Sequence, residues 1–328
     1  MRISSLTYFT SSLSSMQDNQ SKIARLNEQI SSGQRMLAAR DDPLSAEKAM
    51  RLSSRVAVRE QYLANQQKAG LALDYENTVL KEMEKTLTDV RALVVQSSGS
   101  DTQALRDQHA AMLKNMYLHF KDLANNRDTE GHYIFAGFNT NLDSANPPFQ
   151  HTQVYPTGPS ASGTYSGTPD GALLSSQGVR SITVDDGRSV QVTDNLENVI
   201  KFSSPVDING VNTTDVLQAL DQIAITLSDS SLTTDQVNTA VNNAVNALTD
   251  TLGRLGNIQR RVAATTLEVN DITKTTENLI LLEKNALSDL TLIDKAAAII
   301  EMQSRQTSLQ AAQQAYAQTS KLSLFSYL

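Results

Sequence analysis

Helix-breaking residues are concentrated in one part of this 328-residue chain, and their distribution constrains the fold more than any other feature. Six of the seven prolines lie between Pro147 and Pro205, and nine of the fourteen glycines lie between Gly131 and Gly210. Proline interrupts the hydrogen bonds of a helix and glycine weakens it, so this central block is rich in turns. The two long flanks are almost free of both residues and can form long helices.

Both flanks carry narrow apolar stripes whose members are three and four residues apart. In the first flank the stripes comprise Leu6, Phe9, Leu13 and Met16, then Ile23, Leu26 and Ile30, then Leu80 to Val94, and then Leu105 to Leu123. Two apolar positions in seven are typical of a coiled-coil seam, whereas a globular helix has a wider apolar face. The pattern therefore predicts long helices that pair along thin seams.

The second flank repeats this pattern. Residues 234–287 predict one helix which, if continuous, is about 80 Å long at about 1.5 Å per residue. Closer to the C-terminus, Met302, Leu309 and Tyr316 recur every seven residues, with Ala312 at an intermediate seam position and Arg305 interrupting the stripe.

The two chain ends share a weakness, because their stripes are thin and rich in small or polar residues. Such a helix buries too little apolar area to offset an ordering entropy of about 1–2 kcal/mol per residue. We therefore expect the ends to be disordered in the free monomer, and to pair with each other and with further copies of the chain. The predicted assembly interface consists of Leu6, Phe9, Leu13, Met16, Ile23, Ile30, Met302, Leu309, Ala312 and Tyr316.

The central block contains the signals of β structure. Residues 181–192 alternate apolar and polar side chains around Asp186-Gly187, which can supply the positive φ angles of a hairpin turn. A second turn is predicted at Asn209-Gly210, after which Thr213 or Thr214 can cap a helix.

A short apolar segment, "GHYIFAG" at 131–137, stands where the first flank meets this block. Gly131 is expected to end the preceding helix, because glycine readily adopts the left-handed conformation at a helix C-terminus. Residues 133–136 are apolar on both faces, as in a buried strand, and Gly137 allows another turn.

These patterns predict a mainly α fold with a small β insert, in which both chain ends build a long coiled-coil-like helical rod with one central β-rich outer domain. The expected domains are terminal helices forming an inner coiled coil (1–41 and 286–328), a helical rod domain (42–136 and 213–285) and the outer domain (137–212).

Composition excludes several classes of function. The chain has no cysteine, which excludes disulfides and zinc–thiolate sites, and its net charge of −7 argues against binding nucleic acid. No stretch approaches 18 apolar residues, so no membrane contact is expected. The N-terminus lacks the continuous apolar run of a secretory signal, so export, if it occurs, is expected without cleavage of a signal peptide.

No constellation suited to catalysis is apparent. The histidines His109, His119, His132 and His151 lack the spacing of a metal site, and no phosphate-binding or dinucleotide-binding loop is present. We therefore expect no catalytic, cofactor-binding or metal-ligating residues and no enzymatic activity. The stretch from Gly33 to Asp41-Asp42-Pro43 has a structural interpretation: one helix is expected to end near Gly33, after the apolar stripe, and another starts at Pro43 with Asp42 as its cap.

The same stretch belongs to a segment with a family resemblance. The sequence "LNEQISSGQRMLAARDDPLSAEKAMRLSSRV" at 26–56 resembles the N-terminal region shared by flagellins and the hook–filament junction proteins. The matching elements are Ile30-Ser31-Ser32-Gly33, Arg35, Ala39, Asp41-Asp42-Pro43 and Ala46. The C-terminal helix, ending in "LFSYL", is similar to the other end of that superfamily.

Within the superfamily, "GHYIFAGFNTNLDSANPPF" at 131–149 resembles the junction family known as hook-associated protein 3. This resemblance implies a structural adaptor in the extracellular part of the bacterial flagellum, exported by the flagellar type III route. It implies contacts with hook-associated protein 1, with flagellin and with copies of itself in a ring. It further implies that an export chaperone binds the C-terminal helix.

Two alternatives remain open from the sequence. The chain could be a flagellin, in which the same fold polymerises into the filament. It could also be an adhesin, in which an acidic β-rich head recognises a ligand and the helices form a stalk. Residues 141–215 carry eight acidic and three basic side chains, whereas residues 1–40 have a net charge of +3.

Overall fold

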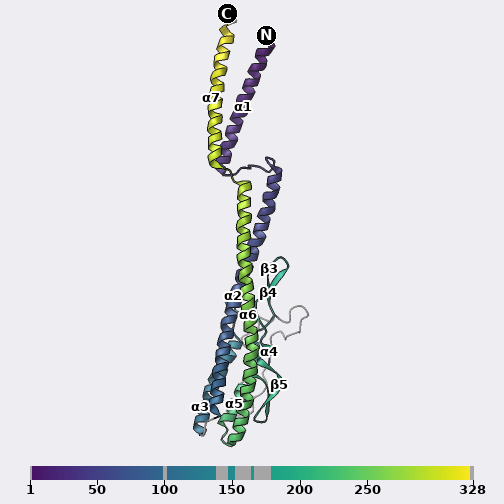
Figure 1. Cartoon of the computed structure of the whole chain (residues 1–328), viewed down its shortest axis with the longest axis vertical. Helices are drawn as coiled ribbons and strands as arrows, with labels where there is room; N and C mark the ends of the chain where they lie inside the picture. The colour runs from purple at the N-terminus through teal and green to yellow at the C-terminus, as the bar shows by residue number, and fades with distance from the viewer. Residues whose placement is uncertain (1, 99–101, 138–146, 152–163, 166–178, 326–328) are drawn as a thin grey trace. The chain divides into compact units, whose positions relative to one another are not determined.

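The computed structural model describes residues 2–98, 102–137, 147–151, 164–165 and 179–325. Most of these residues are helical, and the described strands form three separate antiparallel pairs, β1–β2, β3–β4 and β5–β6 (Figure 1). The predicted class, mainly α with a small β insert, is confirmed. In chain order the elements are α1 (Arg2–Ser32), α2 (Pro43–Ser97), α3 (Gln103–Ala124), β1 (Phe149–Gln150), β2 (Thr164–Tyr165), β3 (Ser181–Asp185), β4 (Arg188–Gln191), α4 (Glu197–Ile200), β5 (Lys201–Ile208), β6 (Val211–Asp215), α5 (Val216–Ser228), α6 (Thr234–Thr291) and α7 (Lys295–Phe325).

The chain forms two compact units. The terminal unit consists of residues 1–60 and 277–328, and the body unit consists of residues 61–276. Helices α2 and α6 each contribute residues to both units. The three domains expected from the sequence have different bounds from these units and remain a prediction.

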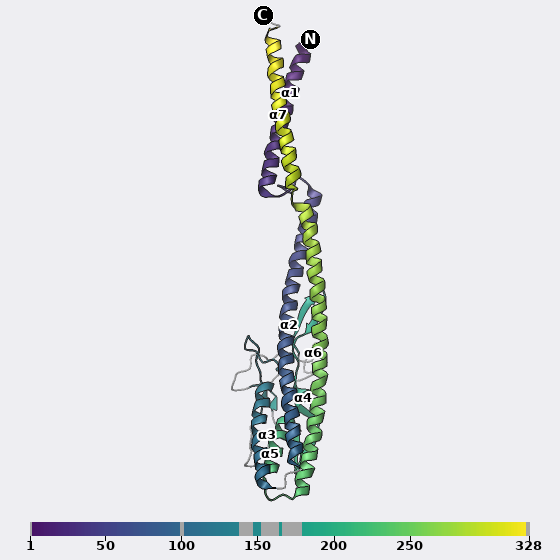
Figure 2. The same cartoon turned by 60° about the vertical axis from the view of Figure 1, so that its left-hand side comes forward.

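In the terminal unit, α1 and α7 lie side by side in opposite directions, with the N- and C-termini at the same end of the pair (Figures 1 and 2). The pairing of the two chain ends is therefore confirmed. Gly33, with φ of +72°, ends α1 as its position after the apolar stripe predicted.

The two connectors at the base of this pair hold each other through backbone hydrogen bonds. The Arg35 N–H donates to the carbonyl of Thr291 at 2.8 Å, and the Ile293 N–H donates to the carbonyl of Gly33 at 3.1 Å. Two residues that are far apart in sequence, Gln34 and Leu292, thus form a small antiparallel bridge.

The body unit contains the hydrophobic core of the protein. Helices α2, α3, α5 and α6 pack together, and the larger buried side chains include Leu80, Met83, Leu113, Tyr117 and Phe120. The short helix α5 is buried along almost its entire length. Strand residues belong to the same cluster, which includes Val184, Val190 and Ile208, and Val192 directly after β4 also belongs to it. The described β segments therefore share one core with the helices.

The segment 131–137 differs from its prediction. Helix α3 ends at Ala124, not at Gly131, because Asn125 leaves the helical conformation and its side-chain amide pairs with the backbone of Phe149. The residues from Tyr133 to Ala136 form a buried turn between two isolated bridges rather than a strand. The segment is apolar on both faces because the turn lies inside the body unit, where Phe135 is fully buried.

The turns of the β segments follow their glycines. Asn209 and Gly210 both have positive φ, as predicted, whereas at the β3–β4 turn only Gly187 does. Asp186 therefore does not adopt the predicted positive φ, and the strands accommodate the turn with a register shift beside Asp185. The predicted caps Thr213 and Thr214 lie in β6 instead.

The helix that follows begins at Val216 because Asp215 takes the capping role. Its carboxylate accepts a hydrogen bond from the Gln218 N–H at 2.8 Å. The long helix expected over 234–287 is confirmed as α6, Thr234–Thr291.

Candidate assembly surface

The seam between α1 and α7 follows a heptad pattern on both helices. On α1 the less exposed positions include Phe9, Ser12, Met16, Asn19, Ile23, Leu26 and Ile30. On α7 they are Ala298, Met302, Arg305, Leu309, Ala312, Tyr316 and Thr319. Each set steps by three and four residues, which is the spacing of a coiled-coil seam.

Contacts across the seam fix its antiparallel register. The rings of Phe9 and Tyr316 meet edge to face, with centroids 5.4 Å apart and an interplanar angle of 84°. Closer to the connectors, the Arg305 guanidinium donates to the Asn19 side-chain oxygen at 3.4 Å. Arg305 is also paired with Glu301 at 2.6 Å. The charged residue that interrupts the apolar stripe therefore has polar partners inside the seam.

The structure brings most of the predicted interface residues together. Leu13 is the exception: Ser12 occupies the seam, so Leu13 points away from it and stays 49% exposed. The side chain of Leu6 lies outside the described residues. The others line this one intramolecular seam: Phe9, Met16, Ile23, Ile30, Met302, Leu309, Ala312 and Tyr316. Their contacts with other subunits remain a prediction.

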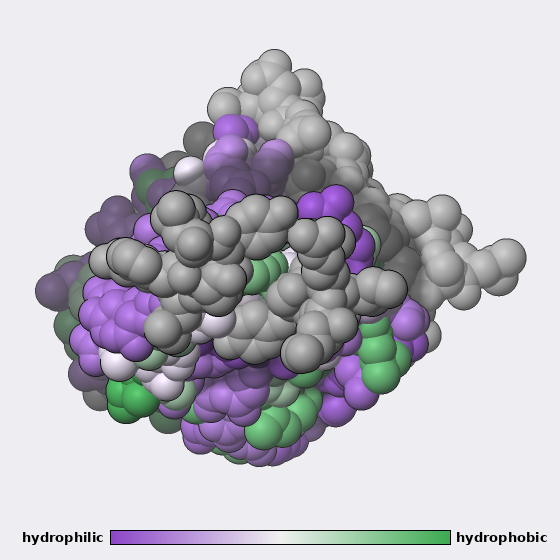
Figure 3. All heavy atoms as spheres, turned by 90° about the horizontal axis from the view of Figure 1, so that it is seen from above, coloured by the Kyte–Doolittle hydropathy of each residue, from purple (hydrophilic) through white to green (hydrophobic). Residues whose placement is uncertain are grey.

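Sequence reasoning missed a second set of apolar side chains in the terminal unit. They share high exposure and positions outside the α1–α7 seam: Leu44, Met50, Val58, Leu281, Leu282, Leu292, Ile299 and Ile300. The uninterrupted run "LILL" at 279–282 was a detectable signal, because a thin seam uses only some of four consecutive apolar residues. In an end-on view, hydrophobic residues form separate areas on a mostly hydrophilic surface (Figure 3).

A groove lies beside the seam. It is lined by both helices of the pair, with Asn19 from α1 and Ile300, Glu301, Ser304 and Arg305 among the residues from α7. Ile300, which is 68% exposed, gives this groove an apolar wall. A mixed apolar and polar groove on an exposed helix pair is a surface that another helix can occupy.

The connector from α1 to α2 is held by two aspartates. The Asp41 carboxylate accepts hydrogen bonds from the Leu37 N–H at 3.2 Å and the Ala38 N–H at 3.0 Å, and lies 3.1 Å from Arg25. The hydrogen bond from Ala38 and the charge of Arg25 lower the pKa of Asp41.

Its neighbour Asp42 caps α2, as predicted, through the Ser45 N–H at 3.1 Å. Hydrogen bonds from Ser45 lower the pKa of Asp42. Both aspartates therefore have a structural role that favours their ionised forms.

A buried ionic cluster joins α2 and α6 within the terminal unit. Glu283, whose side chain is only 6% exposed, lies 2.5 Å from Arg55 and 3.1 Å from Arg59. At the next residue of each helix, the more exposed pair of Lys284 and Glu60 is 2.7 Å apart. These ion pairs hold two helices together where few apolar side chains are buried.

The described ranges contain no group of three or more His, Asp or Glu side chains placed to hold a metal ion. His109 and His151 are buried, and the Nδ1 atom of His151 is hydrogen-bonded to the Tyr117 hydroxyl at 2.6 Å. None of the helices, within their described residues, is long and apolar enough to cross a lipid bilayer.

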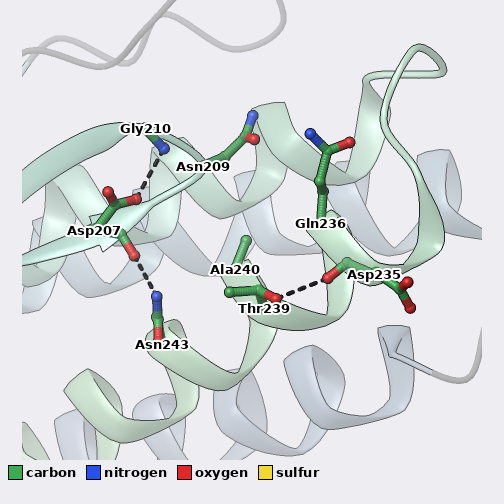
Figure 4. Close-up of a pocket in the computed structure, with 8 residues that line it drawn as sticks. All are labelled: Asp207, Asn209, Gly210, Asp235, Gln236, Thr239, Ala240 and Asn243. Atoms are coloured by element: carbon green, nitrogen blue, oxygen red, sulfur yellow. Dashed lines mark hydrogen bonds between the residues drawn. The ribbon is translucent and has the colours of Figure 1, made fainter.

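A polar pocket lies between the β5–β6 turn and the start of α6 (Figure 4). Several of its polar groups are hydrogen-bonded within the protein. The Asp207 carboxylate accepts from the Gly210 N–H at 2.8 Å, and the Asp207 carbonyl accepts from the Asn243 side chain at 2.8 Å. The Thr239 hydroxyl donates to the Asp235 carbonyl at 2.8 Å. The bond from Asn243 joins the turn to α6, whereas the other two lie within the turn and within the helix.

Comparison with known proteins matches both helical flanks. Residues 3–140 match the bacterial flagellin N-terminal helical region, and residues 238–328 match the bacterial flagellin C-terminal helical region. The chain is 23% identical to flagellar hook-associated protein 3 of Escherichia coli over 99% of each chain. It is 30% identical to flagellar hook-associated protein 3 of Salmonella typhimurium over 141 residues, 43% of this chain and 44% of that one.

Solved structures share the fold. The flagellar junction protein of Legionella pneumophila superposes with a TM-score of 0.56 and 13% identity, covering 74% of this chain and 99% of that chain. At this level of identity the likeness concerns the fold alone.

Proposed function

Because the chain belongs to the flagellin superfamily and resembles hook-associated protein 3 over its whole length, we propose that it is a structural junction protein that joins the flagellar hook to the flagellin filament. As a flagellar hook-associated protein, it is a component of the bacterial flagellum. The proposal concerns its position there, its neighbours and its lack of enzymatic activity.

The observation that carries the proposal is the incomplete burial of the terminal unit. The α1–α7 seam contains Ser12, Asn19, Arg305 and Thr319 among its apolar members, so the pair alone buries little apolar area. Several large apolar side chains of the unit, among them Leu282 and Ile300, remain more than half exposed. Exposed apolar area of this kind is typical of a surface that is covered on assembly.

The proposed partners follow from this position. Hook-associated protein 1 would lie on the hook side, flagellin on the filament side, and further copies of the chain around the ring. A flagellar export chaperone would cover the C-terminal helix before secretion through the flagellar export path, without cleavage of a signal peptide. The junction position is supported by the Legionella pneumophila protein of similar fold, which is described as a flagellar junction protein.

A second candidate function is that of a flagellin, the filament subunit. It is favoured by the match of both chain ends to flagellin helical regions. The two candidates differ in one measurable property, because a junction protein stops after a short layer whereas a flagellin continues to add subunits.

An assembly assay distinguishes the two. Isolated hooks that already carry hook-associated protein 1 are mixed with the purified chain and imaged by electron microscopy, before and after flagellin is added. The proposal predicts a short layer of fixed length that is required for flagellin to polymerise. Hooks without hook-associated protein 1 provide the matched control and should bind no layer.

Two outcomes would contradict the junction role. Unlimited growth of the purified chain into a filament would assign it as a flagellin. Failure to bind the capped hook, with a chain that is folded by circular dichroism, would remove the proposed contact with hook-associated protein 1.

A further inference from the structure

A buried acid lies where the β3–β4 hairpin meets the helices of the body unit. Glu76, on α2, is 1% exposed and carries no role in the proposed assembly surface. Its Oε1 accepts a hydrogen bond from the Asp194 N–H at 2.7 Å. Its Oε2 is buried and has no hydrogen-bond partner in the protein. An unpaired carboxylate oxygen in such a place is costly, which favours the neutral acid.

The charged groups that face Glu76 among the described residues come from three elements. Arg261 reaches it from α6, and Arg180 and Asp194 come from the segments on either side of the hairpin. The Asp194 carboxylate is engaged by Arg261 and by the Gln191 side-chain amide, which donates at 2.5 Å. Arg180 is 3.5 Å from Asp128. Both nearby cations thus have other carboxylate partners.

Burial raises the pKa of Glu76 to about 8, and the charges of Arg261 and Arg180 oppose this rise without cancelling it. Near neutral pH the side chain is therefore mostly a carboxylic acid. A cavity of about 10 Å³, lined by Glu76, Gln191, Asp194 and Arg261 among others, adjoins this acid. That volume holds about one water molecule, too few to hydrate a carboxylate fully.

The hairpin is attached to the helices by few polar contacts. The side-chain amides of Asn65 and Gln66 donate to the carbonyls of Thr183 and Val184 at 2.9 and 2.7 Å. Arg188 pairs with Glu268 at 2.6 Å near the turn. At the other end of the hairpin, the segment after β4 is attached to α2 through Glu76 and Asp194.

From this geometry we propose that protonated Glu76 is a pH-dependent latch, which holds the β3–β4 hairpin and the segment after it on α2 and α6. Ionisation places a second carboxylate beside Asp194 in a space that water cannot fill. The charge becomes hydrated when residues 191–194 move away from α2, which releases the hairpin and exposes Val190 and Val192. The helical core of α3 and α5 remains packed.

The direction of the pH effect follows from the two states. The docked state keeps the proton of Glu76 up to a pH of about 8, whereas a released side chain loses it near the ordinary value of about 4.3. The released state is therefore favoured progressively as pH rises between these values, and the docked acid itself ionises near pH 8.

Hydrogen–deuterium exchange of the full chain between about pH 6 and pH 9.5, corrected for intrinsic exchange rates, tests the latch. We expect protection of peptides from 181–195 to fall by up to about tenfold per pH unit as pH rises to about 8 and to level off above it, since each pKa unit is a factor of ten. Peptides from α3 and α5 should keep their protection. A parallel loss in all peptides, or constant protection at 181–195, would overturn the proposal.

Matched variants locate the effect. Glu76→Gln keeps a neutral acceptor for the Asp194 N–H and should make the protection of 181–195 independent of pH. Glu82→Gln changes an acid on the same helix whose side chain is 45% exposed, and it should retain the wild-type dependence. A pH dependence that survives Glu76→Gln would refute the latch.

A measurement on the unaltered protein covers the case in which Glu76→Gln does not fold. The carboxyl carbon of Glu76 is followed by NMR during the same pH titration. The proposal requires the midpoint of this titration to coincide with the pH at which the exchange protection levels off. A midpoint near the ordinary glutamate value of about 4.3 would exclude it.

Discussion

The terminal unit and the body unit are built from helices with similar sequence patterns, yet they bury apolar side chains very differently. The described apolar residues buried in the terminal unit are Leu26, Ala49, Val56, Ile280 and Ala298. The whole hydrophobic cluster, from Ala69 to Val269, belongs to the body unit. The difference follows from the number of elements that pack together. The seam of α1 and α7 joins only two helices, whereas in the body unit α3, α5 and the β segments also cover α2 and α6.

The contrast suggests that folding stability and assembly contacts belong to different units of the chain. The body unit has a core that can stabilise it in the free chain, because burial of apolar area is the main favourable term in folding. The terminal unit depends on a thin seam, an ionic cluster and a capped connector. We infer that stability is mostly a property of the body unit and that the terminal unit provides the assembly contacts.

The largest expected effect is from Phe120→Ala in the body unit. The ring is fully buried in α3, so its removal leaves a cavity and should lower the free energy of unfolding by about 3–5 kcal/mol. Urea unfolding followed by circular dichroism measures this. The control is Leu118→Ala, two residues earlier on the same helix, where the side chain is 44% exposed. This variant should change the free energy of unfolding by under about 1 kcal/mol. Equal effects at the two positions would contradict the assigned core.

A smaller effect is expected from Glu283→Ala in the terminal unit. The change removes charged hydrogen bonds to Arg59 and Arg55, and Arg55 can turn to solvent, so a loss of about 2 kcal/mol is expected. Thermal unfolding, followed in the same way, tests it. Glu60→Ala breaks the half-exposed pair with Lys284 and should cost under about 1 kcal/mol. If both variants behave alike, burial of Glu283 does not matter.

Acid should loosen the connector between α1 and α2 with a still smaller, local effect. Asp41 and Asp42 have lowered pKa values in the folded chain, so their stabilisation is present above the ordinary value of about 3.9 and is lost as pH falls through the folded values. Amide exchange at Leu37, Ala38 and Ser45 measures this loss.

The variant Asp41→Asn provides an internal control for the acid effect. It should abolish the pH dependence at Leu37 and Ala38, whose N–H groups it bonds, and preserve it at Ser45. A change at all three amides would show that the connector opens as one unit.

The smallest effect on stability, with the greatest effect on assembly, is expected from Leu309→Asp. Leu309 is a partly buried member of the thin seam, which buries little apolar area, so the unfolding free energy of the isolated chain should change by less than about 0.5 kcal/mol. Incorporation onto capped hooks should be abolished. Gln310→Asp introduces the same charge at the exposed next position and should still assemble. A large loss of monomer stability from Leu309→Asp would place the seam among the folding contacts instead.

Some features could be predicted because they depend on neighbours in sequence. The C-terminal end of α1 follows from Gly33, and the start of α2 follows from Asp42 and Pro43. These residues act through the conformation and hydrogen bonds of the adjacent backbone. The pairing of the chain ends follows from the heptad spacing in both. Segment 131–137 could not be assigned, because an apolar run of this length is compatible with a strand or with a buried turn.

The sequence by itself determined where the long helices lie, that the two ends pair, and that β structure is confined to the glycine- and proline-rich centre. Tertiary structure decided that Ser12 and not Leu13 enters the seam, since both positions fit the spacing and only the partner helix selects one. It also decided the burial of Glu76, because the enclosing contact comes from Asp194, 118 residues away. Local periodicity shows which face of a helix is apolar. Which side chains become buried depends on contacts between segments that are distant in sequence.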